Sequence, residues 1–225
     1  MLRWAKLPLT INIRAVQQEV TALSSGWQPH FNTRHYNGNW TVLPLRSPGG
    51  ETGCILPEVL SHGGFGDTPG MNSCPEIRTF LSQFNCPLMS VRLLNLAAGA
   101  EIKEHRDREL SFEQGEARLH VPIFTNEHVR FYVQGQRVQM EEGDCWYLNA
   151  GLPHSVCNNG DSDRIHLVID CIVNDWLKQL FDKSEKQEAT TQDNTVQRQV
   201  IEELRRKGTP EADQLALQLE AALEN

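Results

Sequence analysis

The sequence predicts a mainly β protein, a sandwich or barrel of short strands with helices at its edges. Between residues 27 and 175, short runs rich in β-branched and aromatic side chains recur at regular spacing. Gly, Pro and Asn separate these runs, as expected for tight turns between strands. Helical periodicity is largely confined to a segment near the amino terminus, a segment at 75–84 and the carboxy-terminal part of the chain.

The elements follow from local patterns taken in order along the chain. Asn12 is a candidate cap for a first helix with Val16, Val20 and Leu23 on one face, and residues 24–26 end it. A second helix is expected over 75–84, packed on the outside of the sheets. The expected strands cover residues 40–45, 90–96, 118–123, 129–133, 137–140, 145–148, 155–157 and 165–172.

Composition shifts near residue 180, which divides the chain into three predicted parts. Residues 1–180 form the β domain, and residues 181–194 form a polar linker with few large apolar side chains. Residues 195–225 form a pair of amphipathic helices, the second of which begins at Thr209 and Pro210. Helices this short need a packing partner. They dock either on the β domain or on a second copy of the chain, which would give a homodimer.

The charge balance excludes some classes of protein. The formal net charge is −8, so nucleic acid is not an expected partner, because binding phosphates needs a basic surface. Most apolar runs are far shorter than the roughly 20 residues of a membrane span. The first ten residues lack the apolar core of a secretory signal, so we expect a cytoplasmic protein whose scattered cysteines stay reduced.

One constellation suggests metal chemistry. His105 and Asp107 are two residues apart, so on a strand their side chains would leave from the same face. His154, in the run Gly-Leu-Pro-His, supplies a third ligand from a distant strand. Two imidazoles and one carboxylate occupy one face of an octahedron and leave positions open, which is the pattern of non-haem Fe(II) oxygenases.

Arg164 opens a strongly apolar run and is therefore expected to be buried. A buried guanidinium needs a carboxylate partner. One interpretation is an ion pair with a nearby acid such as Asp161 or Asp170. The other is a dicarboxylate ligand held by the guanidinium fork. His166, between apolar neighbours, is interpreted as a structural histidine.

Residues 91–176 resemble the aspartyl/asparaginyl β-hydroxylase family of Fe(II)/2-oxoglutarate dioxygenases, which includes bacterial proline hydroxylases. The resemblance covers these runs in order: Val-Arg-Leu-Leu at 91–94, His-Arg-Asp at 105–107, Arg-Leu-His-Val-Pro-Ile at 118–123, Gly-Asp-Cys-Trp at 143–146, His-Ser-Val at 154–156 and Arg-Ile-His-Leu-Val-Ile-Asp at 164–170. Residues 39–46 resemble the bacterial branch. The resemblance implies a double-stranded β-helix (cupin or jelly-roll) core with flanking helices.

The same resemblance implies the site and its cofactors. His105, Asp107 and His154 would bind Fe(II), and Arg164 would hold the distal carboxylate of the cosubstrate 2-oxoglutarate. Arg118 and His120 match a family strand beside the keto-acid end of this cosubstrate. Leu94 stands where some members have a cosubstrate-binding Ser. The implied enzyme is an oxidoreductase that uses O₂ to hydroxylate its substrate while 2-oxoglutarate becomes succinate.

The substrate candidates rest on position alone. They are Arg46, Trp40, Asn126 and Arg92. The expected substrate is a small amino acid or short peptide, with an aspartyl, asparaginyl or prolyl residue also open. The alternatives are a cupin-type metalloenzyme that needs no keto acid, such as an isomerase or another dioxygenase, and a non-catalytic metal-binding module. The remaining histidines His30, His35, His62 and His128 are expected at the surface.

Overall fold

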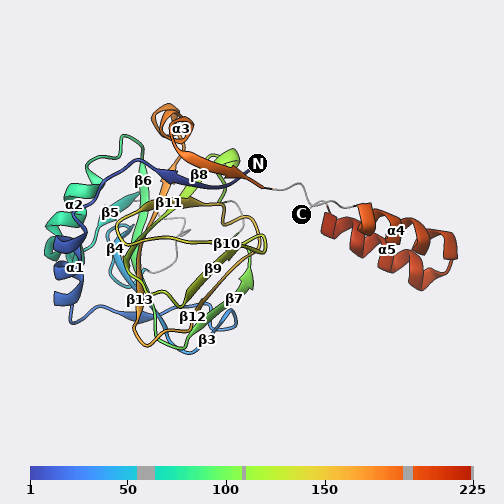
Figure 1. The fold of residues 1–225 in the computed structure, drawn as a ribbon, viewed down its shortest axis with the longest axis horizontal. Helices are drawn as coiled ribbons and strands as arrows, with labels where there is room; N and C mark the ends of the chain where they lie inside the picture. The colour runs from blue at the N-terminus through green and yellow to red at the C-terminus, as the bar shows by residue number, and fades with distance from the viewer. Residues whose placement is uncertain (55–63, 108–109, 190–194, 224–225) are drawn as a thin grey trace. The chain divides into compact units, whose positions relative to one another are not determined.

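A computed structural model describes residues 1–54, 64–107, 110–189 and 195–223 of the chain (Figure 1). The chain divides into two compact units, Met1–Glu188 and Ala189–Asn225. The first unit contains both β-sheets, and the second contains two helices.

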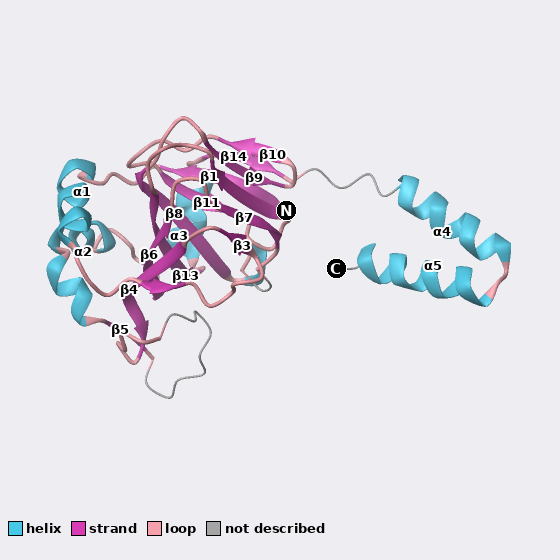
Figure 2. Ribbon diagram, turned by 90° about the horizontal axis from the view of Figure 1, so that it is seen from below, coloured by secondary structure: helices cyan, strands magenta, loops and turns pink. Residues whose placement is uncertain are grey.

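The first unit is built from two antiparallel sheets (Figure 2). The larger sheet contains, in spatial order, β14 (Glu185–Glu188), β1 (Leu2–Leu7), β11 (Cys145–Leu148), β8 (Glu116–Phe124), β13 (Arg164–Ile172), β6 (Leu88–Leu96), β4 (Trp40–Pro48) and β2 (Gln28–Pro29), and β5 (Phe65–Asp67) pairs with β4. The smaller sheet contains β10 (Gln136–Val138), β9 (Val129–Val133), β12 (His154–Asn158), β7 (Glu101–His105) and β3 (Tyr36–Asn37).

The central strands of the larger sheet alternate between two environments. On β13, Leu167 and Ile169 belong to the main hydrophobic core, and their neighbours Arg164 and His166 face a polar interior. Successive side chains of a strand point to opposite faces, so one strand serves both the core and the site. The core lies on the side of the sheet that the helices cover.

Helices close this core from outside (Figure 1). They are α1 (Ile13–Ala22), α2 (Pro75–Leu81) and α3 (Asp175–Asp182), with short 3₁₀ turns at Pro69–Ser73 and Phe112–Gln114. α1 buries Val16 and Val20, and α2 buries Ile77 and Phe80. Burial of such side chains stabilises the fold by about 1.5–3 kcal/mol each. The interior between the sheets thus remains available for polar side chains.

The expectation of a mainly β jelly-roll core with flanking helices is confirmed, with local differences. β1 and β7 were not among the expected strands. Asn12 precedes α1 but makes no side-chain capping bond, whereas Asn174, at the start of α3, accepts a bond from the Leu177 N–H. Both expected helices of the first unit are present.

The predicted linker over 181–194 is partly regular structure. Residues 185–188 form β14, which pairs with β1 and extends the larger sheet at its edge. All its side chains are exposed, so it lacks the apolar alternation that marks a strand in a sequence. Besides the backbone pairing, Gln187 bonds Trp4 and Gln136. Residues 190–194 lie outside the described part of the chain.

The second unit consists of α4 (Thr195–Lys207) and α5 (Pro210–Leu223), which pack against each other. Arg205 and Glu220 form an ion pair between them at 2.7 Å, and Thr209 accepts a bond from the Ala212 N–H. A homodimer through these helices stays a prediction. Among the described residues, every helix is too short or too polar to cross a bilayer.

Candidate metal centre

Two histidines of the smaller sheet face one another across a strand pair. His105 ends β7 and His154 begins β12, and the two are directly paired in the antiparallel register. Their ring centroids are 4.2 Å apart. Each Nδ1–H donates to a backbone carbonyl two residues earlier, at 2.8 Å from Lys103 and 3.0 Å from Leu152. Because a carbonyl only accepts, each ring keeps a lone pair on Nε2.

Asp107 joins this pair from a loop and not from a strand. β7 ends at His105, so strand alternation is not what brings the carboxylate to the histidines. Instead, the Asp107 backbone N–H donates to Ala150 O at 2.9 Å, which ties the loop to the turn before β12. One carboxylate oxygen, Oδ1, lies 3.7 Å from Nε2 of His105. Potential ligand atoms of His105, Asp107 and His154 all lie within 4.8 Å of one another.

This donor set fits a divalent transition metal. Burial lowers the pKa of His154 to about 4, so its ring is neutral and able to ligate at neutral pH. For Asp107, burial raises the pKa, but Arg118 and the nearby imidazoles lower it more, so the carboxyl is ionised. The carbonyl bonds to both Nδ1 atoms are the supporting contacts that commonly orient metal-binding histidines. Two nitrogens and one carboxylate oxygen suit Fe(II).

Asp170 organises the arginines behind this cluster. It lies on β13, is 1 % exposed, and accepts bonds from Ser90, Arg92 and Arg118 at 2.7–3.0 Å. Arg118 also bonds Oδ2 of Asp107, so it bridges the two carboxylates. Burial raises the pKa of Asp170, but Arg118 and Arg92 lower it by more, so the net pKa lies well below the usual range. Arg118 thus holds Asp107 in place while lining the cavity.

Arg164 has a different environment, although it is almost as buried, at 2 % exposure. Its Nη2 donates to Nδ1 of His166 at 2.8 Å, and its guanidinium carbon lies 5.7 Å from the Phe131 ring centroid. Among the described residues it forms no ion pair with a carboxylate, and its Nε has no partner. Burial lowers the pKa of Arg164 to about 9. Among the described residues, Arg164 therefore pairs with neither Asp161 nor Asp170, and Asp170 binds Arg92 and Arg118 instead.

A cavity of about 590 Å³ connects these groups. The three candidate ligands line it together with Arg118, His120 and Arg164, which the resemblance assigns to the cosubstrate. Trp40 and Arg92, two of the substrate candidates, also line it. Leu94 is part of the wall. Arg92 is paired with Asp170, whereas Nε1 of Trp40 has no partner among the described residues.

The other two substrate candidates lie elsewhere. Arg46 bonds Asp67 at 3.0 Å and Phe65 O at 2.7 Å, so it fastens β5 to β4, and it does not line the cavity. The β4–β6 register shifts between Pro44 and Arg46, which interrupts the inward alternation of β4. Asn126 bonds Asn158 and the Ser162 carbonyl and accepts from the His128 N–H, so it serves a turn.

Sequence reasoning missed one wall of the cavity. His30 and His35, expected at the surface, line it beside Phe31. His30 stacks on Trp40, with ring centroids 3.5 Å apart, and burial lowers its pKa to about 3. This segment shows no helical or strand periodicity, so no local signal marks it. His128 is exposed as expected, and His62 lies outside the described residues.

Known proteins match the part of the chain that forms this site. The family model for aspartyl/asparaginyl beta-hydroxylase matches residues 10–173, about three quarters of the chain. The L-proline cis-4-hydroxylase of Rhizobium meliloti (strain 1021) is 29 % identical over 137 residues. That match covers 59 % of this chain and 48 % of the relative, so the chain spans about half the length of that protein.

Solved structures show distant likeness. A prolyl-4-hydroxylase from Pseudomonas putida aligns over 76 % of this chain and 92 % of its own, at 12 % identity and a TM-score of 0.45. A 2OG-Fe(II) oxygenase family oxidoreductase from Burkholderia pseudomallei aligns over 71 % and 78 %, at 12 % identity and a TM-score of 0.45. Scores this low carry no conclusion about activity. The family match spans the His105, Asp107 and His154 cluster and the strand of Arg164, and by that match the chain belongs to the aspartyl/asparaginyl β-hydroxylase family.

Proposed function

We propose that this chain is an Fe(II)- and 2-oxoglutarate-dependent dioxygenase that hydroxylates a small amino acid or short peptide. His105, Asp107 and His154 would hold the iron, and Arg164 would hold the distal carboxylate of 2-oxoglutarate. Family membership supports this activity. So does the donor set, which leaves coordination positions open for a chelating cosubstrate and O₂.

The observation that carries the proposal is the state of Arg164. A guanidinium that is 2 % exposed and has no carboxylate partner among the described residues is costly to bury. It faces the same cavity as the three candidate ligands, so an anionic ligand there would compensate its charge. 2-Oxoglutarate has the required chemistry, a chelating keto-acid end and a carboxylate at the other end.

The residues of the cavity would divide the work. When bound, Fe(II) with 2-oxoglutarate supplies the oxidation of a substrate C–H bond by O₂, with release of succinate and CO₂. Arg118 fixes the Asp107 carboxylate through Oδ2 and leaves Oδ1 directed at His105. His120, on the neighbouring strand β8, lies in the wall beside Arg164, and its buried neutral ring offers a hydrogen bond without adding charge. The apolar part of the wall excludes water from the reacting centre.

The substrate would occupy the space between the iron ligands and the wall of Trp40, His30 and Phe31. A cavity of about 590 Å³ lies within the usual range for small-molecule sites, so a five-carbon diacid and a small amino acid fit together. The named activity of the Rhizobium meliloti relative, on L-proline, supports a free amino acid as the substrate class. Aromatic faces are suited to a compact apolar ring or to an ammonium group.

Titration of anaerobic Fe(II)-loaded protein with 2-oxoglutarate tests the proposal. Chelation of iron by a keto acid produces a visible charge-transfer band, which we expect to saturate. The standard amino acids and short Asp-, Asn- and Pro-containing peptides are then screened for stimulated release of succinate in air. No band and no succinate would contradict the proposal and favour a metalloenzyme that needs no keto acid.

A further inference from the structure

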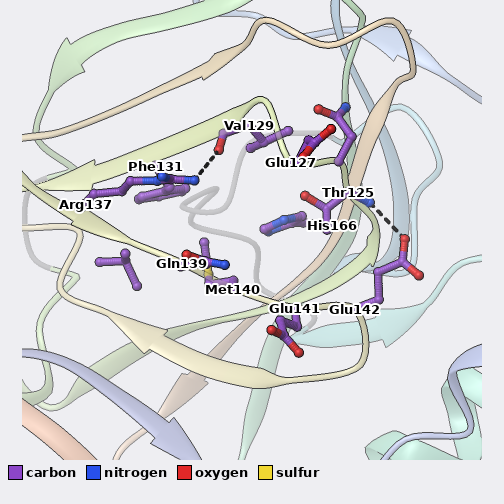
Figure 3. A pocket seen from close by; sticks show the side chains of 12 residues that line it. Thr125, Glu127, Val129, Phe131, Arg137, Gln139, Met140, Glu141, Glu142 and His166 are labelled. Carbon is purple, nitrogen blue, oxygen red and sulfur yellow. Dashed lines mark hydrogen bonds between the residues drawn. The ribbon is translucent and has the colours of Figure 1, made fainter.

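A second cavity, of about 330 Å³, is lined by Phe131, Arg137, Met140 and His166 among others (Figure 3). Phe131 lines both cavities, and His166 lines the second. Arg164 lines the first cavity, so part of its surroundings is open space. A long side chain beside open space keeps a fixed position only if something bonded to it is itself fixed.

His166 meets this requirement. Arg164 and His166 are two residues apart on β13, so both leave the strand on the same face. Nη2 of Arg164 and Nδ1 of His166 are 2.8 Å apart, and His166 is 1 % exposed. Its ring also makes an edge contact with His120 on the adjacent strand, with centroids 5.8 Å apart.

The protonation of this pair follows from the geometry. A guanidinium only donates, so Nδ1 of His166 is unprotonated and Nε2 carries the hydrogen. Burial lowers the pKa of His166 well below its usual value, and the nearby Arg164 lowers it further, so the ring stays neutral. A neutral acceptor orients the guanidinium without neutralising it. A carboxylate at this position would satisfy the charge and compete with a ligand.

We propose that His166 is the positioning residue for Arg164, which it holds in the orientation that receives the distal carboxylate of the 2-oxo acid. This inference rests on the proposed function and goes beyond it, because His166 touches neither the metal ligands nor the cavity that holds them. Its contribution is therefore specific to the distal carboxylate and absent for a 2-oxo acid that lacks one.

Two near-isosteric variants separate positioning from packing. In His166→Asn the side-chain Oδ1 takes the place of Nδ1 and still accepts from Arg164, and in His166→Leu a methyl group replaces it. Binding of 2-oxoglutarate and of 2-oxopentanoate, which has the same chain length without the distal carboxylate, is measured by calorimetry on anaerobic Fe(II)-loaded protein. Thermal unfolding of each protein reports folding, and His166→Val replaces His166→Leu if the latter does not fold.

The wild type is expected to prefer 2-oxoglutarate. His166→Leu should raise the dissociation constant of 2-oxoglutarate about tenfold, the usual effect of one hydrogen bond to a charged group, and leave that of 2-oxopentanoate within about twofold. His166→Asn should retain most of the wild-type preference. If His166→Leu keeps the full preference, or if both ligands weaken equally, the positioning role is wrong. If the wild type itself shows no preference, the proposed function fails, and this inference fails with it.

Discussion

Arg164 combines a proposed binding role with an energetic cost to the free protein. Its buried guanidinium has no carboxylate partner among the described residues, and burial lowers its pKa to about 9. A charge of this kind is stabilised only when its ligand arrives. The residue that would recognise the cosubstrate therefore also destabilises the folded protein when no ligand is bound.

Replacing Arg164 by Met tests both the binding of 2-oxoglutarate and the cost of burying the charge. We expect 2-oxoglutarate to bind at least about 100-fold more weakly, because two charge-assisted hydrogen bonds are lost. We also expect the free variant to unfold several degrees higher, since an apolar side chain of similar length removes the cost of burying the charge. Calorimetry with and without the ligand measures both quantities. A lower melting temperature for the free variant would contradict the account of Arg164.

The candidate iron ligands make a second prediction at this scale. Asp107→Ala and His105→Ala are each expected to abolish Fe(II) binding and succinate production while the protein stays folded, since neither residue belongs to the hydrophobic core. Metal content and circular dichroism measure the two effects. His128→Ala is the matched control, because His128 is exposed and lies outside the cavity. Retention of bound iron in the Asp107 variant would overturn the ligand assignment.

Strand β13 is the element that links the core to the site. Its odd-numbered residues Leu167 and Ile169 pack in the hydrophobic core, and its even-numbered residues Arg164, His166 and Asp170 face the polar space between the two sheets. A shift of register by one residue would exchange the two sets. Pairing with β6 on one side and β8 on the other prevents that shift and keeps Arg164 on the face that lines the cavity.

Asp170 makes the stability of the folded protein depend on pH. Its carboxyl has a lower pKa in the folded protein than in the unfolded chain, so its contribution to the free energy of unfolding is complete above a pH of about 4 and is lost as the pH falls towards the folded value. Asp170→Asn should destabilise the protein by about 3–5 kcal/mol at neutral pH, because Arg92 and Arg118 lose their shared partner.

Urea unfolding at several pH values measures this effect. The difference between wild type and Asp170→Asn should be largest near neutrality and shrink below a pH of about 4. Asp175→Asn, at an exposed acid on α3, is the matched control and should differ little from the wild type at any pH. If the difference in the free energy of unfolding stays constant with pH, the charge of Asp170 does not contribute to stability.

At the scale of the molecule, the first unit contains every residue that the proposed chemistry needs. The buried residues of the main hydrophobic core lie between Ala5 and Phe181, and the residues that line the cavity lie between His30 and Arg164. The second unit has its own helix–helix packing. The two units should therefore be separable.

A chain ending at Glu188 tests that separation. We expect its thermal midpoint to shift by less than about 2 °C and its affinity for 2-oxoglutarate to match the full chain, because the hydrophobic core of the first unit is built from residues before Glu188. Differential scanning calorimetry and ligand titration make the comparison. Weaker binding by the shortened chain would show that the second unit contributes to the site.

Several features were predictable because they depend on local pattern. Alternating apolar runs with Gly and Pro between them indicate strands, and in the larger sheet β4, β6, β8, β11 and β13 lie where these runs are. The residue types at 105, 107 and 154 indicate a metal, and an arginine that begins a strongly apolar run indicates a buried cation that needs an anionic partner, either a protein carboxylate or a ligand. These inferences require only residue type and spacing.

The exposed strand β14, the Asp107 loop and the wall at His30 were not predictable in this way. β14 is held by backbone pairing with β1 and by polar contacts of Gln187 with Trp4 and Gln136. Asp107 reaches the histidines through a bond to Ala150, and His30 is buried by stacking on Trp40. Each depends on a partner distant in sequence.

The sequence by itself determined the β class, the donor set and the buried cation of this protein, since hydrophobic alternation and ligand chemistry are properties of single residues and their near neighbours. Only the tertiary structure decided which carboxylate each arginine binds. Asp170 binds Arg92 and Arg118, and Arg164 meets a neutral histidine, because antiparallel pairing of β13 with β6 and β8 brings those groups within hydrogen-bonding distance.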